Sequence, residues 1–216
     1  MNSFEFQFAT KMIFGKDKES CVGEEIKNFG GSRVLVVYGG KSIKKSGLYD
    51  KVMESLEASG LWIKELPGVV PNPRVSLVRE GIEICRAEKI DFLLAVGGGS
   101  VIDTCKAISF GVFYEGDVWD LITGKAQPGK ERIPVADILT LPAAGSEGSD
   151  SCVISDETIS VKAGFGSPLM RPVFSIMNPE LTYTLPAYQT ACGGMDIMAH
   201  AMERYFSHTE GVETTD

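Results

Sequence analysis

The chain has 216 residues, of which 44% are hydrophobic, and a formal net charge of −8 at pH 7. This size and composition suit one folded domain or slightly more, with a buried core. The acidic balance argues against a nucleic-acid partner, because phosphate backbones are bound through clustered Lys and Arg. No apolar run reaches the roughly 18 residues that span a bilayer, so we expect no membrane partner.

Residues 1–14 alternate aromatic and polar side chains, which is typical of a strand rather than of a signal peptide. We therefore expect a cytoplasmic protein. The five cysteines are odd in number and include no Cys-x-x-Cys pair, so neither a disulfide framework nor a cysteine zinc site is predicted. We expect reduced, partly buried thiols.

Beyond the first strand, apolar β-type runs alternate with helical patterns, which predicts an α/β fold with a parallel sheet and crossover helices. Helices are expected around 48–56, over 73–89 and from 100 to 113, and a hairpin from 151–154 and 159–163. From residue 186 onward the pattern is only helical. We expect an α/β domain over 1–185 and the first helix of a second domain over 186–216. The remaining strands of the sheet are expected at 33–38, 61–66, 91–96, 136–141 and 173–177.

In parallel sheets of this kind, ligands bind at the carboxyl ends of the strands. Three loops rich in glycine or small residues are expected at that edge, namely 39–42, 97–100 and 143–146. Gly97-Gly98-Gly99-Ser100 directly precedes a helix, whose backbone N–H groups and dipole can hold a pyrophosphate. The alternative is a tight turn that needs only positive φ. Its place at a strand-to-helix junction favours the phosphate site.

Gly40-Lys41-Ser42 imitates the end of a P-loop, but that motif requires a glycine where this chain has Leu35. We reject the P-loop on this ground. Neither glycine loop gives the Gly-x-Gly-x-x-Gly fingerprint of the standard dinucleotide fold. A nucleotide would therefore bind through a variant arrangement.

Asp196 and His200 are four residues apart in a helical stretch, so a carboxylate and an imidazole share one helical face. Such a pair is half of a divalent-metal site, since a catalytic zinc takes three or more protein ligands. His208 lies roughly 12 Å further along the same helix at about 1.5 Å per residue, too far to share the ion. The alternative is a pair that only stabilises its helix.

Four segments together resemble the iron-containing (group III) alcohol dehydrogenase family, and their order and spacing agree with it along the whole chain. They are Gly97-Gly98-Gly99-Ser100-Val101-Ile102-Asp103-Thr104-Cys105-Lys106, Leu141-Pro142-Ala143-Ala144-Gly145-Ser146-Glu147, Asn178-Pro179-Glu180-Leu181 and the helix of Asp196 and His200. Residues 38–47 and 71–73 are most similar to the branch of NADPH-dependent butanol dehydrogenases and broad aldehyde reductases. The resemblance implies a Rossmann-like, dehydroquinate synthase-like domain followed by an all-helical metal domain, with the active site between them.

The resemblance also implies NADP(H) as the cofactor, with NAD(H) as the alternative. The stretch 39–42 has no carboxylate that would bind a ribose 2′-hydroxyl and repel a 2′-phosphate, which favours NADP(H). For Leu141 and Leu181, the alternative to a cofactor contact is an ordinary position in the core. For Lys162, the alternative is a solvated surface charge. The implied cofactor contacts are Gly39, Gly40, Ser42, Asn72, Gly97, Gly98, Gly99, Ser100, Asp103, Thr140, Leu141, Ser146, Ser149, Lys162 and Leu181.

In the family, Asp196 and His200 match the first two of four metal ligands, and the last two are histidines beyond residue 216. We therefore expect a C-terminally truncated chain of a homodimeric Fe²⁺- or Zn²⁺-dependent enzyme. The implied reaction transfers hydride between NADP(H) and short-chain aldehydes or alcohols such as butanol. Two alternatives remain, a non-catalytic nucleotide-binding fragment and a polyol- or glycerol-type dehydrogenase.

Overall fold

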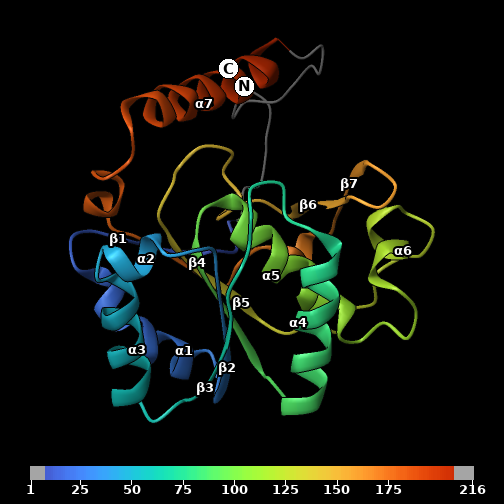
Figure 1. The fold of residues 1–216 in the computed structure, drawn as a ribbon, viewed down its shortest axis with the longest axis horizontal. Helices are drawn as coiled ribbons and strands as arrows, with labels where there is room; N and C mark the ends of the chain where they lie inside the picture. The colour runs from blue at the N-terminus through green and yellow to red at the C-terminus, as the bar shows by residue number, and fades with distance from the viewer. Residues whose placement is uncertain (1–7, 207–216) are drawn as a thin grey trace, which may run out of the picture.

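A computed structural model describes residues 8–206, and its centre is a six-stranded sheet in the order β1-β8-β5-β4-β2-β3 (Figure 1). Every neighbouring pair of strands is parallel, which confirms the predicted α/β class. Of the expected N-terminal strand, residues 1–7 lie outside the described range. The strands of the sheet are β1 (Lys11–Phe14), β2 (Arg33–Tyr38), β3 (Trp62–Leu66), β4 (Phe92–Gly97), β5 (Val135–Leu139) and β8 (Phe174–Met177).

The central strands are buried on both faces, because successive side chains point to opposite sides of the sheet. Val34 and Val36 of β2 face a core formed with α1 (Val22–Asn28), α2 (Ser42–Lys45) and α3 (Leu48–Ala58). Leu35 and Val37 face a second core formed with α4 (Val75–Glu88), α5 (Gly99–Gly111) and α6 (Val118–Ile122). The result is a three-layer α/β/α domain.

The hairpin of β6 (Ser151–Asp156) and β7 (Val161–Gly166) lies outside this sheet and is antiparallel. The hairpin is confirmed, but its turn lies later than the sequence predicted, at 157–160 instead of 155–158. Asp156 causes the shift, since its carboxylate accepts hydrogen bonds from both the backbone N–H and the hydroxyl of Thr158. Ser160 then adopts a φ of 53°.

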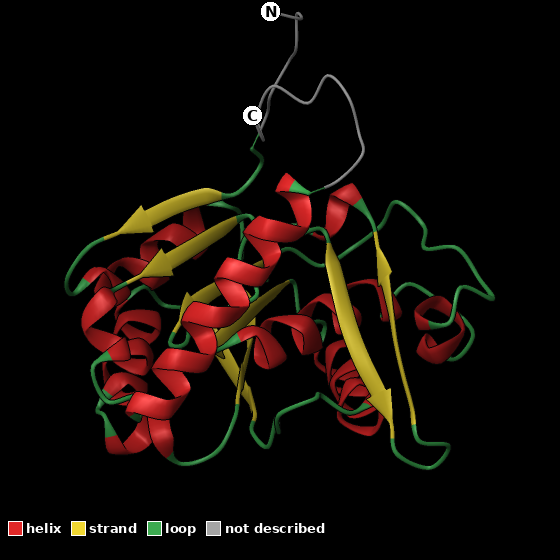
Figure 2. Ribbon diagram, turned by 90° about the horizontal axis from the view of Figure 1, so that it is seen from above, coloured by secondary structure: helices red, strands yellow, loops and turns green. Residues whose placement is uncertain are grey.

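Short 3₁₀ helices precede α1 at η1 (Lys18–Cys21), follow β7 at η2 (Pro168–Met170) and follow β8 at η3 (Pro179–Thr182). The chain then enters α7 (Ala187–Tyr205), which crosses above the carboxyl ends of the strands (Figures 1 and 2). Only Gly193 of α7 is buried. Within residues 8–206, every helix is too short or too polar to cross a bilayer.

Candidate functional site

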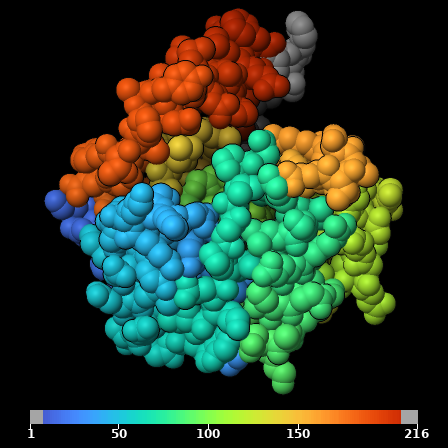
Figure 3. All heavy atoms as spheres, viewed as in Figure 1, coloured from blue at the N-terminus to red at the C-terminus, as the bar shows by residue number. Residues whose placement is uncertain are grey.

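A cavity of about 480 Å³ opens at the carboxyl ends of the strands, below α7 (Figure 3). Its walls come from the loops after β2, β4 and β5 and from the segment that leads into α7. All of its lining residues are described, and none of them is Asp or Glu. Ten of the residues singled out from the sequence line it, namely Gly39, Gly40, Ser42, Gly97, Gly98, Gly99, Ser100, Thr140, Leu141 and Leu181.

The triple-glycine turn joins β4 to α5, and the helix begins one residue earlier than Ser100, at Gly99. Gly98 precedes it with φ −94° and ψ −170°, an extended conformation open to any residue. The turn therefore does not need a glycine for positive φ here. A Cβ on Gly97 would lie 2.5 Å from Val101, whereas one on Gly99 would meet only Ser146 at 3.7 Å. The bare backbone of Gly98 and Gly99 instead gives a ligand close access to the first turn of α5, where N–H groups and the helix dipole favour phosphate.

The loop after β2 forms the opposite wall of the cavity. The Gly39 carbonyl accepts a hydrogen bond from the Gly68 N–H at 3.0 Å, which fixes the start of the loop. Gly40 has open space around it, because among the described atoms none lies within 4 Å of a Cβ built there. Ser42 begins α2, so its hydroxyl and backbone lie where the helix meets the cavity.

Five of the residues singled out from the sequence lie outside the cavity lining. Asn72 accepts a hydrogen bond from the Lys162 ammonium at 2.9 Å, which connects β7 to the loop that carries the lining residues 69–71. The Asp103 carboxylate accepts hydrogen bonds from the Ser146 hydroxyl at 2.6 Å and the Val153 N–H at 3.0 Å, and burial raises its pKa. Ser149, like Ser146, contacts the ammonium of Lys106.

Lys106 itself was missed by sequence reasoning, although its side chain is fully buried. A signal was present, because it is the only lysine in the apolar stretch 101–113. A buried lysine needs acceptors for its three N–H donors. A lysine in this stretch therefore indicates a cluster of polar groups where α5 packs against the rest of the domain.

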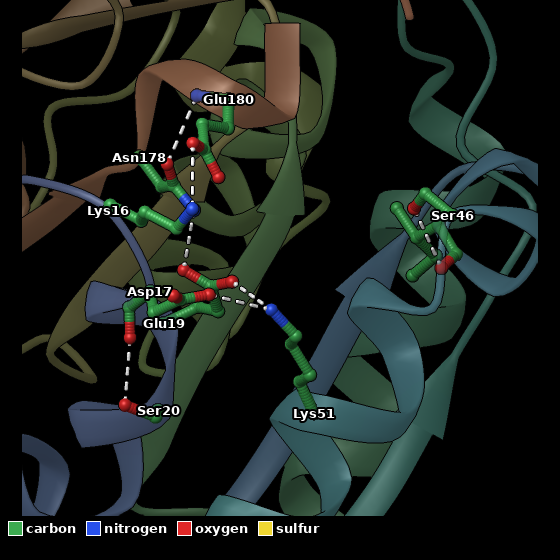
Figure 4. Close-up of polar contacts among 9 residues, drawn as sticks. Lys16, Asp17, Glu19, Ser20, Ser46, Lys51, Asn178 and Glu180 are labelled. Atoms are coloured by element: carbon green, nitrogen blue, oxygen red, sulfur yellow. Dashed lines mark hydrogen bonds and ion pairs between the residues drawn. The ribbon is translucent and has the colours of Figure 1, made fainter. Parts of the chain in front are cut away.

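Leu181 reaches the cavity because a buried polar network anchors η3 (Figure 4). The Glu19 carboxylate is fully buried and accepts hydrogen bonds from the Asn178 amide at 3.0 Å and the Lys51 ammonium at 3.0 Å. Asn178 in turn accepts from the backbone N–H of Glu180 at 3.0 Å and so starts η3. This network ties η1, α3 and η3 together and sets the path of the chain into α7.

Asp196 and His200 lie on one face of α7, with 3.8 Å between the carboxylate Oδ1 and the imidazole Nε2. That distance is too long for a hydrogen bond, so both groups keep electron pairs for an ion. Gly193, Asp196 and His200 follow the spacing i, i+3, i+7 and so share one face of α7. A Cβ built on Gly193 would lie 3.0 Å from the Pro142 carbonyl oxygen. The pair fits the donor chemistry of Fe²⁺ or Zn²⁺, but residues 8–206 contain no group of three metal-ligating side chains.

The fold and the site together define a Rossmann-like α/β domain with a glycine turn at a strand-to-helix junction, and the Asp196/His200 pair lies on the helix above it. A family model described as iron-containing alcohol dehydrogenase matches residues 9–179. The chain belongs to the iron-containing alcohol dehydrogenase family.

Similar proteins share both the sequence and the fold. NADH-dependent butanol dehydrogenase A of Clostridium acetobutylicum is 48% identical over all of this chain and 55% of its own length. NADPH-dependent aldehyde reductase YqhD of Escherichia coli is 38% identical over 95% of this chain and 52% of its own. The crystal structure of NADH-dependent butanol dehydrogenase A from Thermotoga maritima superposes with a TM-score of 0.93 at 42% identity, over 98% of this chain and 53% of that one. The chain thus spans about half the length of the curated relatives it matches.

Proposed function

We propose that this sequence supplies the cofactor-binding part of a metal-dependent alcohol dehydrogenase or aldehyde reductase. The reaction would transfer hydride between NADP(H) and short-chain aldehydes or alcohols such as butanol. The observation that carries this proposal is the cavity, which has the triple-glycine turn and the 39–42 loop on its walls and the Asp196/His200 face of α7 above it. The relatives named for butanol dehydrogenase and aldehyde reductase activities support it.

In this proposal the chain positions both reaction partners. The first turn of α5 binds the pyrophosphate, and the loops after β2 and β5 receive the adenosine half of the cofactor. Asn72, Asp103 and Lys162 lie outside the lining of the cavity, with Asn72 next in sequence to the lining residue Pro71, and Ser146 and Ser149 contact Lys106. Asp196 and His200 would hold the metal, which when bound would supply Lewis acidity toward a carbonyl oxygen.

We infer a preference for NADP(H) over NAD(H), although the names of the relatives divide between the two cofactors. The lining of the cavity carries no carboxylate that would repel a 2′-phosphate. The backbone of Gly39 and Gly40 and the hydroxyl of Ser42 offer hydrogen bonds to such a phosphate, and Lys41 lies between them in the chain.

A fluorescence titration of this chain with NADPH tests the cofactor-binding half, and saturable binding is the expected result. Failure to bind either reduced dinucleotide would contradict the proposal. The catalytic half needs a protein that also contains a helical metal domain, in which butyraldehyde should be reduced and glycerol oxidised poorly. Faster turnover of glycerol would favour a polyol-type dehydrogenase.

A second candidate is a nucleotide-binding module without catalysis. It is favoured by a contrast between the two halves of the proposed site. Within residues 8–206 the glycine turn lines a formed cavity, whereas no group of three metal-ligating side chains comes together. In that case dinucleotide binding would persist in a chain joined to a helical domain, and aldehyde turnover would not appear.

A further inference from the structure

Lys106 lies on α5 two turns after the phosphate turn, and its ammonium sits in a cage of five oxygen atoms. It donates to the carbonyls of Ser146 at 2.7 Å, Ser149 at 2.9 Å and Ser151 at 3.0 Å. It also lies 3.2 Å from the Ser146 hydroxyl and 3.0 Å from the Ser149 hydroxyl. Within the described residues no carboxylate lies within ion-pair distance of it, and burial lowers its pKa. The ammonium is thus held by hydrogen bonds to neutral oxygens that converge on it, and the charge of Asp103 stabilises it from a longer distance.

The segment that Lys106 holds, residues 142–151, lies between the phosphate turn and α7. On one side, the Cβ of Ser146 would be 3.7 Å from a Cβ on Gly99. On the other side, the Pro142 carbonyl lies against Gly193 of α7. Leu141, which lines the cavity, is directly joined to the segment. Any movement of the segment would therefore reach the dinucleotide cavity and the helix of the metal pair together.

Three carbonyl oxygens that converge on one point repel each other unless a cation or a donor lies between them. Without the ammonium, the Ser149 carbonyl would lose its hydrogen bond, and those of Ser146 and Ser151 would keep only longer contacts of 3.3 Å from the N–H and hydroxyl of Ser149. The hold on the segment would weaken, because a polar group away from water is costly when it lacks a good partner. Asp103 contacts only the Ser146 hydroxyl of the segment. Arg171 holds only its later part, through the Gly148 carbonyl at 3.3 Å and the Asp150 carboxylate at 2.8 Å. Lys106 therefore does more than fill volume.

We propose that Lys106 is a positioning residue for dinucleotide binding, and that Ser146 and Ser149 act on binding through it. The proposal rests on the proposed function, because it assumes that the cavity takes a nicotinamide dinucleotide. The ammonium fixes the 142–151 segment, and the segment fixes Leu141 against Gly98, whose Cβ would be 3.3 Å from that of Leu141. The wall of the pyrophosphate site is then rigid before the cofactor arrives, which lowers the entropy cost of binding.

The central experiment is the Lys106→Ala variant, with the dissociation constant for NADPH measured by fluorescence. We expect binding weaker by about tenfold or more, since several charge-assisted hydrogen bonds are lost. Added n-propylammonium matches the atoms removed and should restore much of the affinity. Tetramethylammonium, which has a similar volume and the same charge but no N–H donors, should not. Unchanged affinity in the variant, or equal rescue by both cations, would overturn the proposal.

A second pair of variants decides the matter if Lys106→Ala does not fold. Ser149→Ala removes one hydroxyl that Lys106 contacts, whereas Ser151→Ala removes an exposed hydroxyl and keeps the carbonyl that Lys106 contacts. We expect NADPH binding weaker by about threefold in the first and unchanged in the second. Equal affinities in the two variants would contradict the proposal.

Hydrogen exchange without dinucleotide separates this inference from the proposed function. Amides of residues 142–151 should exchange faster in Lys106→Ala than in the unaltered chain and slow again with n-propylammonium, while those of β4 stay unchanged. If the unaltered chain does not bind NADPH, the proposed function fails, and the exchange pattern still reports whether Lys106 orders the segment. If NADPH binds and exchange is the same in both chains, the inference alone fails.

Discussion

At Gly40 the backbone faces the cavity with open space on its Cα side, so a side chain can be added there without a clash. We expect the unaltered chain to bind NADPH more tightly than NADH. Gly40→Asp should shift the ratio of the two affinities toward NADH by about tenfold or more, because a carboxylate near the 2′-phosphate repels it and can hydrogen-bond a free 2′-hydroxyl. Competitive fluorescence titrations measure both constants.

Gly40→Asn is the matched control, since it adds the same volume without the charge. It should change the ratio much less than Gly40→Asp does. Tighter binding of NADH by the unaltered chain would contradict the predicted preference, whatever the variants do.

Gly98 offers a second test at the scale of one residue. A side chain there would fill the space in which a pyrophosphate approaches the backbone, so Gly98→Val should abolish NADPH binding. Its Cβ would lie 3.3 Å from that of Leu141, so we expect a stability loss of only about 1 kcal/mol. Titration and thermal unfolding on the same sample separate the two effects.

Gly129→Val is the control for Gly98→Val, because a Cβ at Gly129 meets only one backbone atom, at 4.0 Å, and Gly129 is not part of the cavity lining. It should bind NADPH like the unaltered chain. Normal binding by Gly98→Val would mean that the turn has no role in holding phosphate.

Asp137 predicts a pH dependence of stability. It is fully buried on β5, accepts a hydrogen bond from the Ser175 hydroxyl at 2.5 Å, and its Oδ2 has no partner among the described residues. Burial raises its pKa well above the ordinary value of 3.8. The folded state thus holds the proton more tightly than the unfolded state, and this contribution to stability, present below pH 3.8, is lost as pH rises toward the raised pKa.

Asp137→Asn should reduce this loss and be more stable than the unaltered chain at neutral pH by about 1 kcal/mol or more. Urea unfolding between pH 4 and 8 measures the free energy of unfolding of both chains. Asp50→Asn, at an exposed site on α3, should leave the slope as it is. Equal slopes for the Asp137→Asn variant and the unaltered chain would show that Asp137 stays ionised in the fold.

At the scale of elements, α7 carries the proposed metal ligands Asp196 and His200 on an exposed face. We expect the 216-residue chain alone to retain little Fe²⁺ or Zn²⁺ after dialysis and to reduce butyraldehyde negligibly, while NADPH binding persists. Metal analysis, turnover and titration on one sample check all three. Tightly bound metal at one ion per chain would contradict this prediction.

The same helix provides the control for the metal prediction. In a protein that joins this chain to a helical domain with two further histidines, metal and turnover should appear together. His200→Ala should then remove both and leave NADPH binding unchanged.

How far the elements could be predicted depended on their length and burial. The buried strands β2 and β4 were found within a residue, because parallel strands covered on both faces are continuous apolar runs. The helices α1, α2 and α6, of seven, four and five residues, were missed, since they are too short to show a helical period. The strand expected to end at residue 141 ends at Leu139, which leaves Thr140 and Leu141 in the loop that lines the cavity.

The residues of the candidate site could also be predicted only in part, for a different reason. The glycine turns and the pair on α7 follow from local spacing, so the sequence could predict them. The cage around Lys106 joins α5 to a segment about 40 residues later, and Glu19 meets Asn178 across 159 positions. Such contacts depend on tertiary packing that one sequence does not show. For that reason the sequence did not show that the side chains of Ser146 and Ser149 point toward the Lys106 ammonium.

For the whole molecule, the exposed apolar side chains of α7 predict self-association. Met195, Met198, Met202 and Phe206 are all exposed, and a contiguous apolar surface of this kind favours association. Light scattering during size-exclusion chromatography should show the 216-residue chain as more than a monomer at about 100 μM, and dissociating on dilution. The double variant Met198→Gln, Met202→Gln should shift it toward the monomer.

The control for this prediction is Phe113→Gln, which replaces an exposed aromatic residue in the turn that follows α5. It should leave the association unchanged. A monomer at every concentration would show that the apolar face of α7 is too small to hold two copies together. A dimer insensitive to the α7 variants would place the contact between copies elsewhere.

The position of β1 in the sheet has a consequence for folding. Among residues 8–206 this strand pairs only with β8, and residue 11 lies beside residue 174. During synthesis β1 therefore leaves the ribosome long before its partner exists, and the loop that joins the two can close only after the central strands and helices are made. We therefore expect β1, the first described strand in the sequence, to be the last to enter the sheet, and the folding rate of this domain to depend on the arrival of β8 more than on the local helices.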